Sequence, residues 1–462
     1  MRLKLCLNVV PLLVVLGCGD DEGVSGNSDS ENSSSGSTTD DSASSQTIGL
    51  TTSGSSSETE PTMTGVDSSS ETGNSTEGSS GPADSSGSTG SSGSSGDPSG
   101  DSSSSGGGQI QCSDGNVVPG ELCFEPDQQL DVGTQPRAVA VADFDGDGSL
   151  DVVAGNQNSF DATIILGAGD GSFGGGSTVD APGSVLGVLG VDLDGDGDDD
   201  LVTGNSANNS ISTFESSGDG GFGDAVDYAA GSFPRGVTSS DFDGDGINDV
   251  AVASAQSGEV SILLGNGDGT LQPQILFDTA QGSLAVVAGD LDEDGSMDVA
   301  TVNEASDNIA LLLSNGFAFA PAVLVAVGQN PRSLAIGDFD GDGHLDLAVA
   351  NSADNQVGVL LGAGDGSFGA MTTFATGVDP RGIVAADLDA DGVLDLATSN
   401  SFDGTVGVLI GDGAGVFGIA QSFTVGLTPQ TIASGDFDQD GVADLAVSNQ
   451  GSDTLSILLS DP

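Results

Sequence analysis

The sequence predicts an all-β fold, a seven-bladed β-propeller with four-stranded blades, for residues 110–462. Three observations predict it. An aspartate-rich motif recurs seven times at a spacing of 48 or 49 residues, and a period near 50 is typical of propellers and solenoids. Short runs of Val, Ile, Leu and Ala between Gly-rich turns show no helical period. The last repeat lacks a fourth strand, while a spare strand precedes the first motif, which favours a closed ring.

Residues 1–17 are predicted to be a lipoprotein signal peptide. Arg2 and Lys4 provide a positive start, and the apolar run 5–16 is too short for a permanent membrane span. The run ends in Val-Leu-Gly-Cys, which resembles a bacterial lipobox and predicts lipidation at Cys18. The alternative is an ordinary secretory signal with a chance cysteine. We therefore expect an exported chain, lipid-anchored at the bacterial cell envelope. Gly19, where an Asp would favour inner-membrane retention, points to the outer membrane or cell surface.

Residues 18–109 are predicted to be a disordered tether. They are mostly Ser, Gly, Thr, Asp and Glu, with almost no large apolar side chains. Such a composition cannot bury enough surface to offset the entropy of ordering. A flexible coil of about 90 residues has an end-to-end distance of roughly 50 Å. The tether would hold the folded domain away from the membrane.

A short loop between Cys112 and Cys123 precedes the repeats. Cys6 leaves with the signal and Cys18 carries lipid, so these two cysteines remain as an even pair in an oxidising compartment. We expect them to form a disulfide that closes the loop.

Each repeat is interpreted as four strands around the motif Asp-(Phe/Leu)-Asp-x-Asp-Gly-x-x-Asp, whose residues are numbered here as loop positions 1 to 9. In the first unit, 138–142 precedes the motif, 152–154 follows it, and 163–166 leads to a Gly-Asp-Gly turn. The fourth strand is expected to begin at a large apolar residue that stands 19 positions before the next motif. These residues are Phe124, Phe173, Phe222, Leu271, Phe319, Phe368 and Phe417.

Closure of the ring follows from the two ends of the repeat region. The seventh unit stops at Ser460, after its third strand. The segment 124–132 would supply the missing strand by pairing with 454–459. An open solenoid would need capping units, and none is visible.

The repeats resemble the FG-GAP/VCBS repeat family, which includes the propeller of integrin α subunits. The Phe-Gly signature occurs at Phe173-Gly174, Phe222-Gly223, Phe368-Gly369 and Phe417-Gly418. The fourth unit departs from the pattern, because 314–319 has lost the Gly-Asp-Gly turn. The resemblance implies the propeller fold and calcium binding, but this family serves many roles and implies no specific ligand.

The aspartate loops predict about seven Ca²⁺ sites. Calcium takes six to eight hard oxygen ligands, and positions 1, 3, 5 and 9 are Asp in all seven loops, with the backbone carbonyl of position 7 as a further ligand. Acidic turns without metal are the alternative, but they would gather four carboxylates with no cation. The sites are interpreted as structural clamps between two strands of one blade. The expected ligands are Asp143, Asp145, Asp147, Ser149, Asp151, Asp192, Asp194, Asp196, Asp198, Asp200, Asp241, Asp243, Asp245, Ile247, Asp249, Asp290, Asp292, Asp294, Ser296, Asp298, Asp338, Asp340, Asp342, His344, Asp346, Asp387, Asp389, Asp391, Val393, Asp395, Asp436, Asp438, Asp440, Val442 and Asp444.

Charge limits the partners. The formal net charge is −64, from 70 acidic and 6 basic residues, which excludes nucleic-acid binding through a basic patch. Four of the basic residues fall in the repeats, each after a Pro and six positions before a loop. They are Arg137, Arg235, Arg332 and Arg381. We expect them to cluster around the axis, opposite the aspartate loops, as an anion-recognising mouth. The alternative is that each pairs with a nearby acid and steadies a loop.

The function expected is a non-catalytic binding or adhesion scaffold at the cell surface, monomeric, with a surface protein or polysaccharide as partner. The only His, His344, lies in the fifth loop with its side chain expected to face solvent, and no free cysteine remains beside a base. The membrane is contacted only through the N-terminal lipid. The alternatives are a calcium-dependent polysaccharide lyase or hydrolase and a structural component of an envelope complex.

Overall fold

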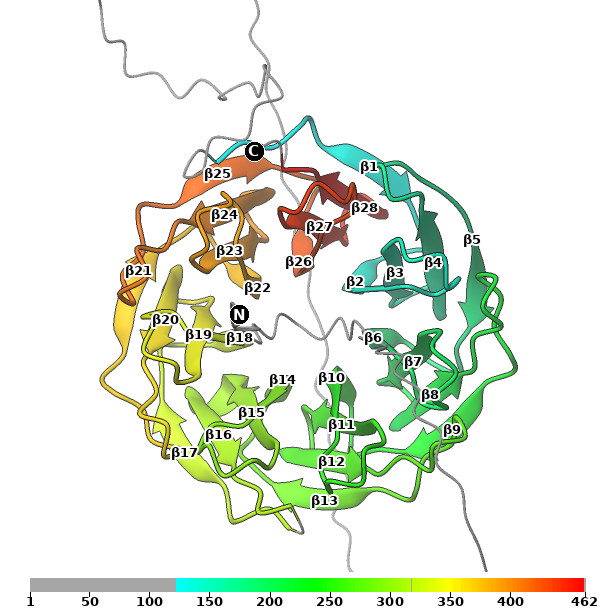
Figure 1. The fold of residues 1–462 in the computed structure, drawn as a ribbon, viewed down its shortest axis with the longest axis horizontal. Coiled ribbons are helices and arrows are strands. Elements are labelled where there is room, and N and C mark those ends of the chain that lie inside the picture. Colours follow the sequence, from blue (N-terminus) through cyan, green and yellow to red (C-terminus); the bar gives the residue numbers. More distant parts are fainter. Residues whose placement is uncertain (1–121, 317, 461–462) are drawn as a thin grey trace, which may run out of the picture. The chain divides into compact units, whose positions relative to one another are not determined.

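The computed structural model describes residues 122–316 and 318–460, which form a seven-bladed β-propeller (Figure 1). Every blade is a four-stranded antiparallel sheet, so the predicted fold class is confirmed. The only helical segment described is a 3₁₀ turn, η1 (Glu304–Ser306), and no described helix is long and apolar enough to cross a membrane. The predicted signal peptide, Cys18, the tether and Cys112 lie outside the described residues.

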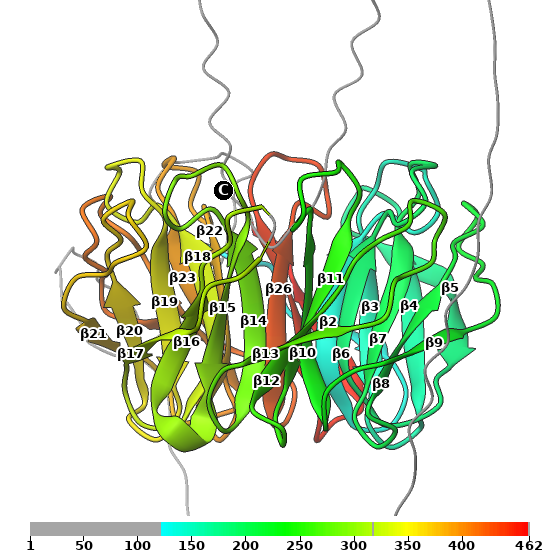
Figure 2. The ribbon, with the colours of Figure 1, turned by 90° about the horizontal axis from the view of Figure 1, so that it is seen from below.

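The innermost strand of each blade faces the propeller axis. These strands run between the two faces of the propeller (Figure 2). They are rich in Ala, Gly, Val and Ser, because seven strands that converge on one axis leave little room for large side chains. They are β2 (Pro136–Ala142), β6 (Val185–Val191), β10 (Pro234–Ser240), β14 (Ser283–Gly289), β18 (Pro331–Gly337), β22 (Pro380–Ala386) and β26 (Pro429–Gly435).

The second and third strands form the core of each blade. Every residue of every second strand is buried, since each blade is covered on both faces by its neighbours. The second strands are β3 (Asp151–Asn156), β7 (Asp200–Asn205), β11 (Asp249–Ser254), β15 (Asp298–Asn303), β19 (Asp346–Asn351), β23 (Asp395–Asn400) and β27 (Asp444–Asn449). The third strands are β4 (Asp161–Gly167), β8 (Ser210–Phe214), β12 (Glu259–Leu263), β16 (Asn308–Leu312), β20 (Gln356–Leu360), β24 (Thr405–Leu409) and β28 (Thr454–Leu458).

The outermost strands lie at the rim, and their residues are exposed or half-buried. They are β1 (Gln128–Asp131), β5 (Phe173–Asp180), β9 (Val226–Ala229), β13 (Ile275–Asp278), β17 (Val323–Ala326), β21 (Thr372–Ala375) and β25 (Gln421–Thr424). The prediction that each starts at its large apolar residue holds only for β5. In the other six blades that residue makes an isolated bridge to the end of the third strand, and the outer strand starts four residues later.

The ring closes between the two ends of the repeat region. Strand β1 pairs antiparallel with β28, from Gln128 opposite Ile457 to Asp131 opposite Thr454, and Phe124 bridges Ser460. Blade seven is therefore assembled from β26, β27 and β28 near the C-terminus and β1 before the first motif (Figure 1). This is the predicted closure.

The large apolar residue before each outer strand packs against the preceding blade. Phe173 of blade one meets Phe437 of blade seven edge to face at 5.3 Å, and Phe222 meets Phe144 at 5.6 Å. Phe417 contacts Phe339 at 5.8 Å in the same way. In each pair the second ring is position 2 of the neighbouring aspartate loop, so these residues join adjacent blades.

Candidate metal centres

Each aspartate loop connects the innermost strand to the second strand of its blade. In the first blade, β2 ends at Ala142 and β3 begins at Asp151, which is position 9. The seven loops therefore lie at the same end of their strands, on one face of the propeller. The residues that begin the innermost strands lie at the opposite face.

The Asp at position 9 is an anchor within the blade. Asp151 is fully buried, and its two carboxylate oxygens accept hydrogen bonds from the amides of Phe144 and Gly167, both at 2.8 Å. The equivalent pair of bonds occurs in all seven blades. The side chain thus ties its loop to the end of the third strand.

The Asp residues at positions 1, 3 and 5 shape the loop. In the first loop, Asp143 accepts a hydrogen bond from Gly148 N–H at 2.9 Å, Asp145 from Asp147 N–H at 3.2 Å, and Asp147 from Ser149 N–H at 2.7 Å. Gly148, at position 6, has a φ of +84°, which an L side chain rarely adopts. The glycine and these Asp turns curl the loop so that its carboxylates gather at one point.

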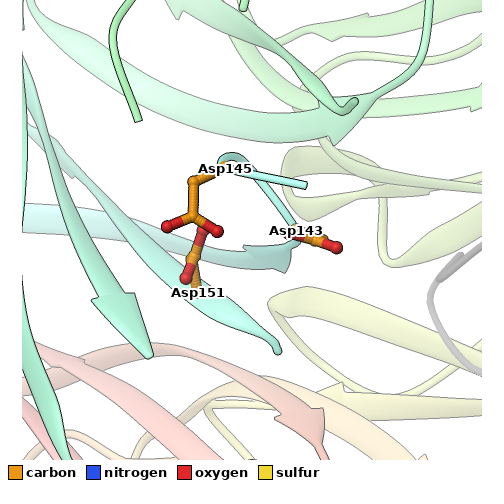
Figure 3. A group of neighbouring side chains, drawn as sticks. All are labelled: Asp143, Asp145 and Asp151. Atoms are coloured by element: carbon orange, nitrogen blue, oxygen red, sulfur yellow. The ribbon is translucent and has the colours of Figure 1, made fainter. Parts of the chain in front are cut away.

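Carboxylates from each loop come within metal-binding distance of one another. In blades one, three and five the gathered oxygens belong to positions 1, 3 and 9, and they all lie within 4.8 Å of one another, as for Asp143, Asp145 and Asp151 (Figure 3). In blades two and four they belong to positions 1, 3 and 5, as for Asp192, Asp194 and Asp196. Positions 1 and 3 are common to both arrangements. Position 5 is exposed and position 9 buried.

The electrostatics of these loops favour a cation. Burial raises the pKa of Asp151 to about 7, although two backbone hydrogen bonds act in the opposite direction. Burial likewise raises the pKa of Asp200 to about 6. Two buried oxygens, Oδ1 of Asp143 and Oδ2 of Asp389, have no hydrogen-bond partner in the described part of the chain. A buried carboxylate oxygen without a partner is costly unless a cation offsets its charge. An oxygen-only donor set of this kind fits a hard divalent cation.

The side chain of His344, at position 7 of the fifth loop, is less exposed than expected. Its ring contacts the carboxylate of Glu293 in the fourth loop and is only one-third exposed, rather than facing solvent freely. This contact raises the pKa of His344, mainly through the hydrogen bond to Glu293. The side chain joins two adjacent loops while its backbone carbonyl stays the predicted ligand.

Sequence reasoning missed the polar side chains at position 8 that bond the loops of adjacent blades. Asp199 Oδ2 accepts a hydrogen bond from the amide of Asp143 at 3.1 Å, and Asn248 donates to the carbonyl of Asp192 at 2.8 Å. Burial raises the pKa of Asp199 to about 6. The available signal was that position 8 is polar only in these two units and apolar in the other five.

The structure places the four arginines around one cavity of about 160 Å³, lined by residues of all seven innermost strands from the second residue of each strand onward. Arg332 forms an ion pair with Glu304 at 2.9 Å, and Arg381 forms one with Asp379 at 2.9 Å. Within the described residues, the Arg137 and Arg235 side chains have no ion pair. Pairing with a nearby acid therefore holds for Arg332 and Arg381, and anion recognition at the cavity stays a prediction.

Cys123 is disulfide-bonded and buried. Its predicted pairing with Cys112 stays a prediction, because Cys112 lies outside the described residues.

Comparison with known proteins agrees with the repeat architecture. The family model of the FG-GAP-like repeat matches residues 143–203, 192–252, 241–301, 290–349 and 338–398. The FG-GAP repeat model matches residues 428–458. Together these segments cover more than half of the chain. No curated protein sequence matches it.

Solved structures of other propellers are similar in fold. A streptogramin B lyase matches 73% of this chain and 98% of its own, with a TM-score of 0.52 and 13% identity. BBS1N in complex with ARL6DN matches 73% and 96%, with a TM-score of 0.54 and 11% identity. Hydrazine synthase of Kuenenia stuttgartiensis matches 71% and 96%, with a TM-score of 0.50 and 14% identity. At such identities the likeness concerns the fold alone.

Proposed function

Because this chain belongs to the FG-GAP repeat family, we propose that its propeller is a calcium-stabilised scaffold for binding or adhesion at the cell surface. It is exported, anchored by lipid at Cys18, and held away from the membrane by residues 18–109. It carries no catalytic activity. Its partner is a surface protein or a polysaccharide.

The observation that carries the proposal is the set of aspartate loops with buried, partnerless carboxylate oxygens. The Oδ1 of Asp143 and the Oδ2 of Asp389 are cut off from solvent without a donor. Calcium accepts six to eight oxygens in irregular geometry, which suits carboxylates joined by a backbone carbonyl. We assign the ligands to positions 1, 3, 5 and 9 and to the carbonyl of position 7.

Calcium supplies positive charge where each loop gathers its aspartates. The protein's own residues hold the loop in shape by backbone hydrogen bonds, and position 9 ties it to the third strand. Since the loops also touch one another between blades, each ion would stabilise the blade and its junction with the next. This role is structural, because four carboxylates and one backbone carbonyl of the loop would supply most of the oxygens that calcium needs.

A scaffold role is also favoured by the side chains near the candidate sites. Nucleophilic catalysis needs a Ser or Cys activated by a base. The chain's one histidine, His344, is engaged with Glu293 on the loop face. The aspartates are committed to loop architecture in every blade. The lyase named above shares only the fold with this chain.

Calcium removal tests the proposal directly. We expect thermal melts of the full chain in calcium and in chelator to differ by many degrees. Each site that binds only the folded state adds about 2.7 kcal/mol when calcium is a hundredfold above its dissociation constant. Magnesium at the same concentration is the control, because it requires a smaller octahedral cage. Identical melts in calcium and chelator would remove the calcium assignment.

The binding role is tested by capture of surface partners. The full chain should retain a protein or polysaccharide from envelope extracts in calcium and release it in chelator. A variant with all seven position-5 aspartates changed to Asn serves as the matched control. If the variant, in chelator, captures the same protein or polysaccharide that the wild type captures in calcium, the proposal of a calcium-stabilised scaffold is contradicted.

A further inference from the structure

The arginine cavity combines half-buried positive charge with an incomplete set of ion-pair partners. Four guanidinium groups line it, and within residues 122–316 and 318–460 only Arg332 and Arg381 are in ion pairs. Two positive charges, on Arg137 and Arg235, are therefore left without a carboxylate in a chain that has 70 acidic residues. Leu186, the equivalent residue of the blade between them, adds an apolar wall to that side of the cavity. Low polarity strengthens any electrostatic interaction made there.

A β-bulge near the start of each innermost strand turns these side chains toward the cavity. All seven innermost strands shift register just after their first residue, so the second residue is left out of the ladder. In blade one, Pro136 pairs with Asn156 and Ala138 with Gly155, while Arg137 has no partner. A β-bulge of this kind re-aims a side chain. Here it directs the equivalent residue of every blade to the cavity.

A backbone hydrogen bond just before each Pro-Arg pair distinguishes the four arginine-bearing blades from the other three described blades. Each Pro-Arg pair follows a non-glycine residue with positive φ, whose amide donates to an Asp or Asn of the preceding blade. These bonds are Gln135 to Asp453 at 2.7 Å, Phe233 to Asn209 at 2.9 Å, Asn330 to Asp307 at 2.8 Å and Asp379 to Asn355 at 2.9 Å. The three blades without arginine have no such bond among the described residues. A strained backbone held by an added hydrogen bond is typical of a pre-organised site.

Burial and mutual repulsion make the unpaired arginines costly. Burial lowers the pKa of Arg137 to about 9, helped by the guanidiniums of Arg235, Arg381 and Arg332 and opposed by the more weakly acting carboxylate of Glu304. The pKa of Arg235 is lowered to about 10, again mainly by burial. Both side chains keep their proton at neutral pH. An anion between them would offset their desolvation and their repulsion together.

We propose that Arg137 and Arg235 form a binding site for one oxyanion, a carboxylate or sulfate presented by the ligand of this scaffold. Guanidinium groups hold such anions through paired N–H donors, which gives geometric selectivity as well as charge. Arg332 and Arg381 also line the cavity, but Glu304 and Asp379 already offset their charges. The inference rests on the proposed binding function and names the chemical class that the scaffold recognises.

A single anionic group fits better than a polyanion. The cavity holds only about 160 Å³, enough for one small group. The described chain has four basic residues, all of them in this cavity, so the remaining charged surface is acidic and repels an extended polyanion. The ligand therefore inserts one anionic end at the axis and makes neutral contacts elsewhere.

The test uses sodium acetate and sodium sulfate as probes of the full chain in saturating calcium. Calorimetric titrations run at constant ionic strength set with sodium chloride. We expect saturable binding by the wild type and at least a tenfold loss of affinity in Arg137→Gln with Arg235→Gln, because about two charge-assisted interactions disappear. Arg137→Lys with Arg235→Lys should fall between them, since it keeps the charge and loses the paired donors.

The control is Ile419→Gln, a substitution at a residue that is 94% exposed and does not line the cavity, so all four arginines stay in place. Its affinity should stay within about threefold of the wild type. Equal affinity of the wild type and the Arg137→Gln, Arg235→Gln variant, or no saturable binding by the wild type, overturns the site. Dextran sulfate tests the single-anion assignment. If it binds through these arginines far more tightly per sulfate group than free sulfate does, the assignment is overturned.

Calcium-dependent melting, measured on the same samples, separates this inference from the proposed function. A wild type that melts later in calcium but binds neither anion overturns the arginine site alone. A wild type that binds anions without any calcium effect on its melt overturns the calcium scaffold and leaves the arginine site supported.

Discussion

Aspartates in one loop have different physical roles. Asp151 is buried, and both its oxygens accept hydrogen bonds from backbone amides that would otherwise have no partner. Asp147 is exposed, and one of its oxygens accepts a hydrogen bond from the backbone two residues on. Position 9 therefore supports the blade whether or not metal is bound, whereas position 5 contributes mainly through the cation.

Two substitutions separate these roles. Asp151→Ala leaves two buried amides unsatisfied and should lower the free energy of unfolding by about 2 to 5 kcal/mol in both calcium and chelator. Asp147→Ala should change it by less than about 1 kcal/mol in chelator but should weaken the stabilisation by calcium. Urea titrations under the two conditions measure both effects. A variant of Asp151 that is unstable only in calcium would contradict the anchoring role.

Blades are joined by the loops and turns of the aspartate face. The amide of Gly171, in the Gly-Asp-Gly turn of blade one, donates to the carbonyl of Phe437 in blade seven at 3.1 Å. Gly415 of blade six donates to Phe339 of blade five at 2.9 Å. The same pairs of blades share an edge-to-face aromatic contact. The Phe-Gly signature and the turn before it thus act as one connector between neighbouring blades.

Removal of one connector ring should destabilise the propeller. Phe417 is 6% exposed and contacts both Phe339 and Phe374. Phe417→Ala should lower the free energy of unfolding by about 3 to 5 kcal/mol, because it leaves a cavity between blades five and six. Phe402, which is 78% exposed, provides the matched control.

Phe402→Ala should change stability by no more than about 0.5 kcal/mol. Chemical denaturation of both variants in calcium is the measurement. Comparable effects of the two substitutions would show that the Phe-Gly ring does not join the blades.

The whole propeller depends on closure between its two ends. Strand β1 completes blade seven through four paired residues, and Leu122 and Phe124 are buried within a core that also holds residues of blades six and seven. Without this segment β28 would present a free edge, which promotes association with other chains. Closure thus joins the N-terminal part of the propeller to its last blade.

Deletion of residues 110–132 should open the ring. We expect a melting temperature lower by several degrees or more and self-association detectable by light scattering. Deletion of residues 110–121 alone, which leaves β1 and Phe124 in place, is the control. Equal melting temperatures for the two deletions would contradict closure by β1.

The period of the aspartate motif, the alternation of apolar runs with glycine turns and the incomplete last unit were enough to predict seven blades and their closure. These features are local and repeat, so each unit carries its own strand order. The gathering of positions 1 and 3 in one loop followed from the same spacing. The start of the outer strand was predicted correctly only for β5. In the other six blades the bridge at Phe222 or its equivalent precedes a short segment outside the ladder.

Contacts between blades were decided by the tertiary structure. Asp199 bonds to Asp143 across 56 residues of sequence, and the ring of His344 contacts Glu293 of the preceding loop. All four arginines stand at equivalent positions of the sequence repeat. Only the folded ring brings Glu304 to Arg332 and Asp379 to Arg381, whereas Arg137 and Arg235 have no ion pair with any residue that the structure describes. A repeat pattern fixes each residue within its own unit, whereas pairing depends on how neighbouring units meet, and that differs from blade to blade.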